Sequence, residues 1–117
     1  MAKYIDGFVL VVPKGKEAEY QKMAEMGRDS WMKHGALDYK ECAGDDLAVK
    51  WGTTFTRMMK LKPGETVVFA YIVFKSRAHR DRVNAKVMKD MKAMGGPPDM
   101  PFDVKRMVYG GFRTLVE

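Results

Sequence analysis

The sequence predicts an α+β fold in which two helices cover one face of a four-stranded antiparallel sheet. Residues 4–12 and 65–74 are rich in β-branched and aromatic side chains, and both faces of each predicted strand are mostly apolar. Strands of this kind lie inside a sheet that is covered on both sides. Apolar residues recur at helical spacing in residues 16–34 and 76–94. The resulting order of elements, βαββαβ, predicts a ferredoxin-like domain.

The composition indicates a single globular domain that spans residues 1–117. Hydrophobic residues make up 46% of the chain and charged residues 31%, which is ordinary for a globular protein. No apolar run approaches the roughly 20 residues that cross a membrane, so we expect no membrane partner. The single cysteine, Cys42, excludes an internal disulfide, and no signal peptide precedes the first strand. Both features predict a cytoplasmic location.

Two further features of the composition bear on partners. The net charge of +6 is compatible with an anionic ligand or a nucleic acid, although a solvated basic surface is the simpler interpretation. The chain also contains 11 methionines, whose side chains fill irregular gaps and line adaptable surfaces. We therefore expect a methionine-rich interior or interface.

The N-terminal half supplies a strand, a helix and a second strand. Residues 4–12 form the first strand, which carries one acid, Asp6, on a mostly apolar face. Residues 16–34 have an apolar stripe at helical spacing, and Gly35 is a typical helix stop. Residues 37–42 alternate apolar and charged side chains, as expected of an edge strand.

A long connection separates this edge strand from the second central strand. Residues 47–62 carry aromatic and methionine side chains among basic residues, and a connection of this length is typical of a functional segment or of a packed arm. We expect residues 53–61 to extend the edge strand. The chain would then return through the turn Pro63-Gly64 as a hairpin into residues 65–74.

The C-terminal part supplies the second helix and the last strand. Ser76 is a typical N-cap for the helix at 76–94. Residues 97–103 form a proline-stiffened loop whose apolar side chains are expected to hold it against the core. Residues 105–116 are the predicted last strand, with a bulge or a close approach at Gly110-Gly111.

The predicted helices leave one face of the sheet without a cover. Both lie on the same face, yet the two central strands are apolar on both of theirs. An apolar face of this size needs a partner, and the simplest one is a second copy of the chain. The sequence therefore predicts a symmetric homodimer formed through the open face of the sheet.

Several short segments occur in an order that is known from one family. They are Tyr-x-Asp-Gly-Phe at 4–8, His-Gly-Ala at 34–36, Glu-Cys-x-Gly-Asp-Asp at 41–46, Glu-Thr-Val-Val-Phe at 65–69, Met-Pro-Phe-Asp-x-Lys-Arg-Met at 100–107 and Tyr-Gly-Gly-Phe at 109–112. Over nearly its whole length the chain resembles the YbaA-like family of uncharacterised bacterial proteins, within the dimeric α+β barrel superfamily. The resemblance implies a fold and a dimer but no activity. The superfamily includes cofactor-free monooxygenases, haem-degrading enzymes and stress proteins, which is an analogy of fold only.

Four polar residues are the candidate catalytic groups: Asp6, His34, Arg106 and Tyr109. A carboxylate on a central strand must be paired, hydrated or protonated, and Arg106 or Lys105 on the neighbouring last strand could pair with Asp6. Tyr109 could add a hydrogen bond. A structural ion pair or a dimer contact would explain the same pattern. His34 is a candidate base, although an imidazolium is also favourable at a helix C-terminus.

A second group of residues follows the edge strand. Cys42, Asp45 and Asp46 could form a redox site, or simply a surface turn beside a thiol. One cysteine, two distant histidines and adjacent acids match no spacing of metal ligands. We therefore predict neither a metal nor a cofactor.

These observations lead to one functional hypothesis with two alternatives. The hypothesis is a cytoplasmic homodimer that binds a small, partly apolar molecule between sheet and helices, with cofactor-free oxidation as its enzymatic form. The first alternative is a binding or interaction protein without catalysis. The second, less favoured, is an RNA-binding module, because residues 69–74 fit the tail of the RNA-recognition strand. Val67 and Val68 stand where that motif has a basic residue and a glycine.

Overall fold

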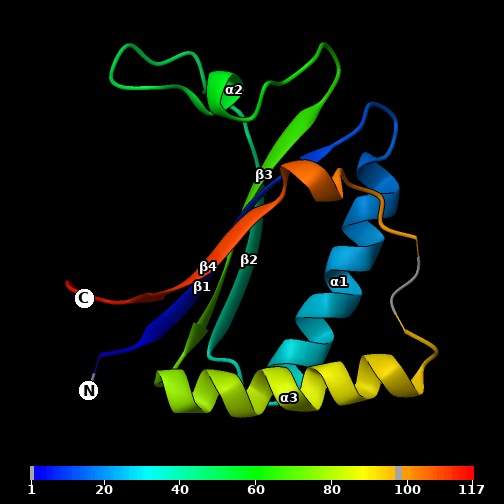
Figure 1. The fold of residues 1–117 in the computed structure, drawn as a ribbon, viewed down its shortest axis with the longest axis vertical. Coiled ribbons are helices and arrows are strands. Elements are labelled where there is room, and N and C mark those ends of the chain that lie inside the picture. The colour runs from blue at the N-terminus through cyan, green and yellow to red at the C-terminus, as the bar shows by residue number, and fades with distance from the viewer. Residues whose placement is uncertain (1, 97–98) are drawn as a thin grey trace.

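The computed structural model, which describes residues 2–96 and 99–117, has one four-stranded antiparallel sheet and three α-helices (Figure 1). The strands are β1 (Tyr4–Val12), β2 (Asp38–Ala43), β3 (Thr66–Phe74) and β4 (Val108–Arg113). The helices are α1 (Glu17–Lys33), α2 (Phe55–Met58) and α3 (Arg77–Ala93), and a short 3-10 helix, η1 (Val104–Arg106), precedes β4. The strand order is β2-β3-β1-β4, and each neighbouring pair is antiparallel. The α+β class is therefore confirmed.

Most of the predicted elements occur where the sequence places them, with two differences. Ser76 caps α3 as predicted, because its hydroxyl accepts a hydrogen bond of 3.1 Å from the backbone N–H of His79. The predicted strand at 53–61 is wrong, since Thr54 caps the helical turn α2 instead. The last strand begins later than expected because the side chain of Asp103 accepts from the N–H of Lys105 and starts η1.

Helices α1 and α3 lie on one side of the sheet and bury its helix face (Figure 1). Two clusters of buried side chains fill this layer, and their members from the sheet are Leu10, Val12, Val68, Ala70, Ile72 and Phe74. The helices contribute Tyr20 from α1 and Val83 and Val87 from α3. Phe102, from the loop after α3, packs against the first cluster as predicted, whereas Pro97 and Pro98 lie outside the described residues.

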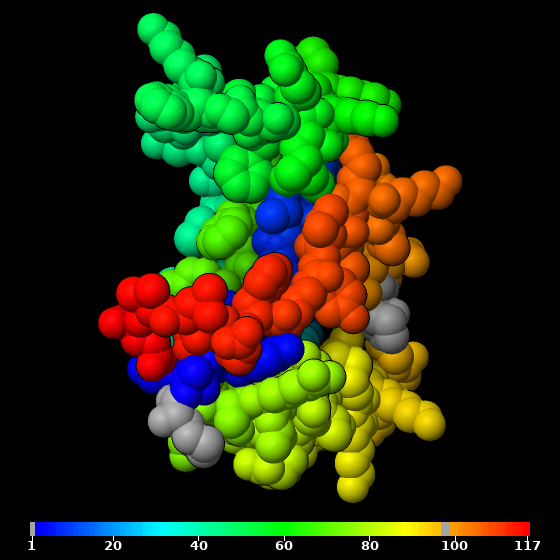
Figure 2. Space-filling view, turned by 60° about the vertical axis from the view of Figure 1, so that its left-hand side comes forward, coloured from blue at the N-terminus to red at the C-terminus, as the bar shows by residue number. Residues whose placement is uncertain are grey.

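The opposite face of the sheet, called here the open face, is covered only at one end. The cover is an arm, residues 44–65, which contains α2 and brings the buried side chain of Met59 against Val11 and Val67. Figure 2 looks onto this side of the molecule, where the green arm stands over one end and the orange and red β4 segment runs across the other. On the uncovered part, Phe69 of β3 is 48% exposed and Phe112 of β4 is 60% exposed. The arm therefore shields part of the apolar surface and leaves the rest uncovered.

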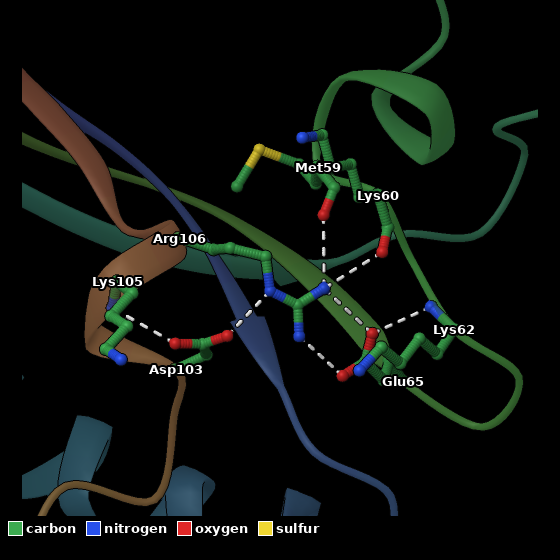
Figure 3. A network of polar contacts seen from close by, with 7 residues as sticks. All are labelled: Met59, Lys60, Lys62, Glu65, Asp103, Lys105 and Arg106. Atoms are coloured by element: carbon green, nitrogen blue, oxygen red, sulfur yellow. Dashed lines mark hydrogen bonds and ion pairs between the residues drawn. The ribbon is translucent and has the colours of Figure 1, made fainter.

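Arg106 holds the arm in place (Figure 3). Its guanidinium donates to both carboxylate oxygens of Glu65, at 2.9 and 2.6 Å, and to Asp103 at 2.6 Å. It also donates to the backbone carbonyls of Met59 and Lys60, at 3.1 and 3.0 Å. One side chain thus joins η1 to the base of the arm through bidentate, charge-assisted hydrogen bonds.

Acid should weaken this anchor. The hydrogen bonds from Arg106 lower the pKa of Glu65 from 4.5 to about 2. A carboxylate whose pKa is lower in the folded chain stabilises the fold above pH 4.5 and loses that contribution as the pH falls towards 2. We therefore expect Glu65→Gln to reduce the free energy of unfolding at neutral pH. The same variant should make that free energy fall less steeply between pH 4.5 and about 2, as measured by denaturant unfolding.

The matched control is Glu25→Gln, which removes an exposed glutamate whose one side-chain hydrogen bond is to Gln21. It should leave the acid profile of the unchanged chain intact. Identical acid profiles for Glu65→Gln and the unchanged chain would contradict the anchoring role.

Candidate functional site

A cavity of about 520 Å³ lies between the helix face of the sheet and the two long helices. This volume is in the range of small-molecule sites, roughly 300–1,000 Å³. Its walls are mostly apolar, with Phe8 and Ile72 from the sheet, Trp31 from α1 and Val87 from α3. Six methionines line it, namely Met23, Met26, Met91, Met94, Met100 and Met107. Met26, Met94 and Met100 of this set are exposed, so the methionines line an accessible cavity, and the predicted methionine-rich interior or interface stays a prediction.

One wall of the cavity carries a carboxylate between two tyrosines. Glu41 of β2 points to the helix face, where the hydroxyl of Tyr20 donates to its Oε1 and the hydroxyl of Tyr39 donates to its Oε2 at 2.5 Å. Burial, together with these hydrogen bonds to a carboxylate, raises the pKa of both tyrosines above the ordinary value. At neutral pH both hydroxyls are therefore protonated donors and Glu41 is the acceptor.

The same three residues also border a second cavity of about 360 Å³, near the β2 edge of the sheet. Ala24 of α1 is the fourth residue that lines both cavities. Arg28 and Lys40 line only the smaller one, and each is paired with a neighbouring aspartate. The carboxylate of Glu41 thus lies at the junction of two cavities.

A second polar cluster surrounds Asp6, whose side chain is buried. Its Oδ1 lies 3.4 Å from Nε of Arg80, and Asn84 donates to Oδ2 at 3.5 Å. Arg80 in turn donates to the hydroxyl of Tyr4 at 3.1 Å and packs over its ring. Burial raises the pKa of Asp6, and the nearby Arg80 opposes the shift. The cluster reaches the larger cavity through Trp31, whose Nε1 donates to Asn84 at 2.9 Å.

The predicted pairing of Asp6 with Arg106 is wrong. In the sheet, the residue of β4 opposite Asp6 is Gly111, and Arg106 lies in η1, where Glu65 and Asp103 bind it. The partners of Asp6 are instead Arg80 and Asn84 of α3, a role that the sequence analysis missed. Their spacing of four residues indicates that both lie on one face of α3, but it does not identify Asp6 as their partner.

The other two candidate catalytic residues also have partners of their own. His34 Nε2 lies 2.5 Å from Oδ2 of Asp90, and this contact lowers the pKa of Asp90. Tyr109 stacks on Phe8, with ring centroids 5.5 Å apart, and is 65% exposed. No hydrogen bond or ion pair within residues 2–96 and 99–117 joins any two of Asp6, His34, Arg106 and Tyr109. None of the four side chains lines the larger cavity.

The second group of candidate residues, Cys42, Asp45 and Asp46, lies apart from both cavities. Cys42 is a free, exposed thiol opposite Phe69 on the open face, and Asp45 and Asp46 follow it in an exposed, irregular segment. In the part of the chain that the structure describes, no three metal-ligating side chains cluster. Across the same residues, no helix is long and apolar enough to cross a membrane.

The fold and the cavity define an α+β domain with one antiparallel sheet and a ligand-sized space under its helices. The chain belongs to the family of proteins of unknown function DUF1428, which it matches over residues 3–104. It is 38% identical over 115 residues to the uncharacterised protein YbaA of Escherichia coli K12, with 98% of each chain covered. The same identity and coverage apply to YbaA of Shigella flexneri. The resemblance found in the sequence is thereby confirmed.

Two solved structures share only a loose likeness with the chain. The de novo designed protein Foldit4 gives a TM-score of 0.47 at 9% identity and covers 98% of this chain and 99% of its own. A Bacillus cereus protein related to NIF3 gives 0.39 at 15% identity and covers 99% of this chain and 27% of its own. Likenesses of this size carry no functional information.

Alkaline titration should identify the tyrosines at Glu41. Their raised pKa means that the fold gains stability from them below about pH 10 and loses it as the pH rises further. We expect Tyr20 and Tyr39 to ionise only as the chain unfolds, which ultraviolet absorbance of tyrosinate measures. Replacing both by phenylalanine should remove the fraction of the signal that coincides with unfolding.

Tyr109→Phe is the control, because it removes an exposed hydroxyl that lies outside the Glu41 cluster. It should leave unchanged the fraction of the tyrosinate signal that appears together with unfolding. Ionisation of all five tyrosines in the still-folded chain would contradict the geometry at Glu41.

Proposed function

We propose that the chain acts as a cytoplasmic homodimer of ferredoxin-like subunits, each of which binds a small, partly apolar molecule in the larger cavity. The observation that carries the proposal is the cavity itself, because its mostly apolar walls and its volume of about 520 Å³ are typical of small-molecule sites. The strand order, read as 4-1-3-2 from the opposite edge, supports the ferredoxin-like assignment. The free thiol of Cys42 suits a reducing compartment.

The open face supports a dimer in the arrangement of a dimeric α+β barrel. Its uncovered part presents Phe69, Val108 and Phe112, which are 48%, 57% and 60% exposed. Tyr71 and Val73 extend this surface and are half-buried. Exposed apolar side chains that adjoin one another on a sheet are typical of an interface rather than of a free surface. A second copy stacked on the same face would bury them around a two-fold axis.

Binding is the part of the proposal that rests on the cavity. Of the residues predicted as catalytic, His34 is connected to the cavity through Asp90 and Tyr109 through Phe8. Cofactor-free oxidation stays a prediction from the sequence.

RNA binding is a second candidate, and one observation favours it. Phe69 and Tyr71 lie side by side on the open face, with ring centroids 6.3 Å apart, and Lys40 is paired with Tyr71 in the neighbouring strand. Two aromatic rings on an exposed sheet can stack with bases. The two candidates use the same surface, so a stable dimer excludes the RNA role and a stable monomer favours it.

Self-association can be tested by changing the open face alone. We expect the chain to sediment as a dimer, and Phe69→Glu to weaken association on the order of 30-fold or more, because it removes an aromatic anchor from each half of the interface. The control is Met88→Glu on α3, since Met88 is 49% exposed, almost the same as Phe69. Equal sedimentation of both variants and the unchanged chain as monomers would contradict the proposal.

Occupancy of the cavity can be tested with its own tryptophan. Trp51 is 90% exposed, so Trp51→Phe leaves Trp31 in the cavity wall as the remaining indole of the two in the chain. A neutral naphthalene derivative that enters the cavity should quench the fluorescence of Trp31 in a saturable way. Ala24→Phe should weaken this binding by about tenfold or more, because the added ring fills the cavity.

The matched control for this variant is Ala18→Phe, which places the same ring on the exposed side of the same helix. It should leave probe binding unchanged. Equal quenching in the Ala24→Phe and Ala18→Phe variants would place the probe elsewhere on the chain and contradict the proposal.

A further inference from the structure

The charged side chains that line the larger cavity are all acidic. Among the described residues they are Glu19, Glu41, Asp90 and Asp99, and no lysine, arginine or histidine lines this space. The chain as a whole has the opposite balance, with 21 basic residues against 15 acidic ones. The charge of the cavity lining is therefore negative, whereas the net charge of the chain is positive. A cationic group would be favoured inside the cavity.

Glu41 is the acid best placed to meet a ligand. Asp90 already has His34 at 2.5 Å, whereas Glu41 has no ion-pair partner in the part of the chain that the structure describes. Its two tyrosine donors are neutral, and they fix both carboxylate oxygens without supplying a positive charge. Each oxygen can accept further hydrogen bonds. A half-buried carboxylate beside an apolar space gains most from a cation that comes with the ligand.

Aromatic rings flank this carboxylate on both sides. Trp31 and Tyr39 lie with ring centroids 6.1 Å apart, and Tyr20 meets Phe102 edge to face at 6.1 Å. All four rings line the larger cavity. An ammonium group attracts the faces of such rings as well as the carboxylate, and the attraction is stronger where water is excluded. The methionine side chains farther along the cavity suit the apolar body of the same molecule.

We propose that the larger cavity binds amphiphilic cations, meaning molecules with an apolar or aromatic body and one amine or quaternary ammonium group. The ammonium group would face Glu41 between the aromatic rings, and the body would lie among the methionines. The inference rests on the proposed function, because it specifies the ligand class of the cavity to which that proposal assigns binding. It adds the sign of the ligand's charge and the residue that selects it.

The test compares three probes of nearly equal shape that differ in charge: phenylpropylammonium, phenylpropanol and phenylpropanoate. Their affinities are measured on the full chain by quenching of Trp31 in the Trp51→Phe background and by calorimetry. We expect the cation to bind about tenfold or more tightly than the neutral alcohol, and the anion most weakly, because only the cation can pair with the half-buried carboxylate of Glu41. This comparison needs no change to the cavity itself.

A variant then assigns the preference to one residue. Glu41→Gln keeps an acceptor for a tyrosine hydroxyl and removes the charge, so the cation should lose about tenfold in affinity while the alcohol keeps its own. Glu117→Gln is the control, because Glu117 is an exposed acid that lines neither cavity, and it should leave the affinity for the cation unchanged. Circular dichroism establishes that each variant is folded.

The outcomes separate the two proposals. Equal affinities for cation and alcohol, or tightest binding of the anion, would overturn the cationic ligand class and leave the binding function standing. Failure of all three probes and of the neutral naphthalene derivative to bind would overturn both. A cation preference that persists unchanged in folded Glu41→Gln would overturn the role given to Glu41.

Discussion

The central constraint on this protein is that its two inner strands, β1 and β3, carry apolar side chains on both faces. Fully burying one large apolar side chain contributes roughly 1.5–3 kcal/mol, so a sheet of this kind is stable only when both faces are covered. Helices α1 and α3 cover one face, with Leu10, Val68 and Ile72 among the buried side chains. The arm covers one end of the other face, and Phe69 and Phe112 remain exposed on the rest. The layout of the molecule follows from how each face is covered.

The arm shows why a charged residue that looks catalytic in the sequence can be structural. Arg106 was a candidate because the sequence predicted it on the last strand, beside Asp6, but its donors are taken up by Glu65, Asp103 and two backbone carbonyls (Figure 3). One of those carbonyls belongs to Lys60, which has a positive φ of 51° that is uncommon for a residue with a side chain. The ion pair thus holds a bent backbone in place and brings Met59 over Val11. Its effect is on the open face and not on the cavity.

Local patterns in the sequence predicted the elements well and the contacts between distant segments poorly. The bounds of β1 follow from its run of β-branched and aromatic residues, and Ser76 identifies the start of α3, because both signals are local. The helical turn α2 was missed because Thr54, its N-cap, lies within a segment whose apolar residues also fit a strand. The partners of Asp6, Arg80 and Asn84, lie 74 and 78 residues further along the chain, so local spacing could not pair them with Asp6. Only part of the Glu41 cluster could be predicted from the sequence. Tyr39 lies on the same strand face two residues earlier, whereas Tyr20 comes from α1.

We propose different roles for the two faces of the sheet: the helix face binds a ligand in its cavity, and the open face joins two subunits. The second role follows from the exposed apolar side chains of the open face, such as Phe69 and Phe112. Small-angle X-ray scattering at micromolar concentration tests it directly. The account predicts a particle of twice the 13.3 kDa chain mass, with a radius of gyration well above the 15.1 Å of one subunit. A folded particle of 13.3 kDa with a radius of gyration near 15.1 Å would contradict it.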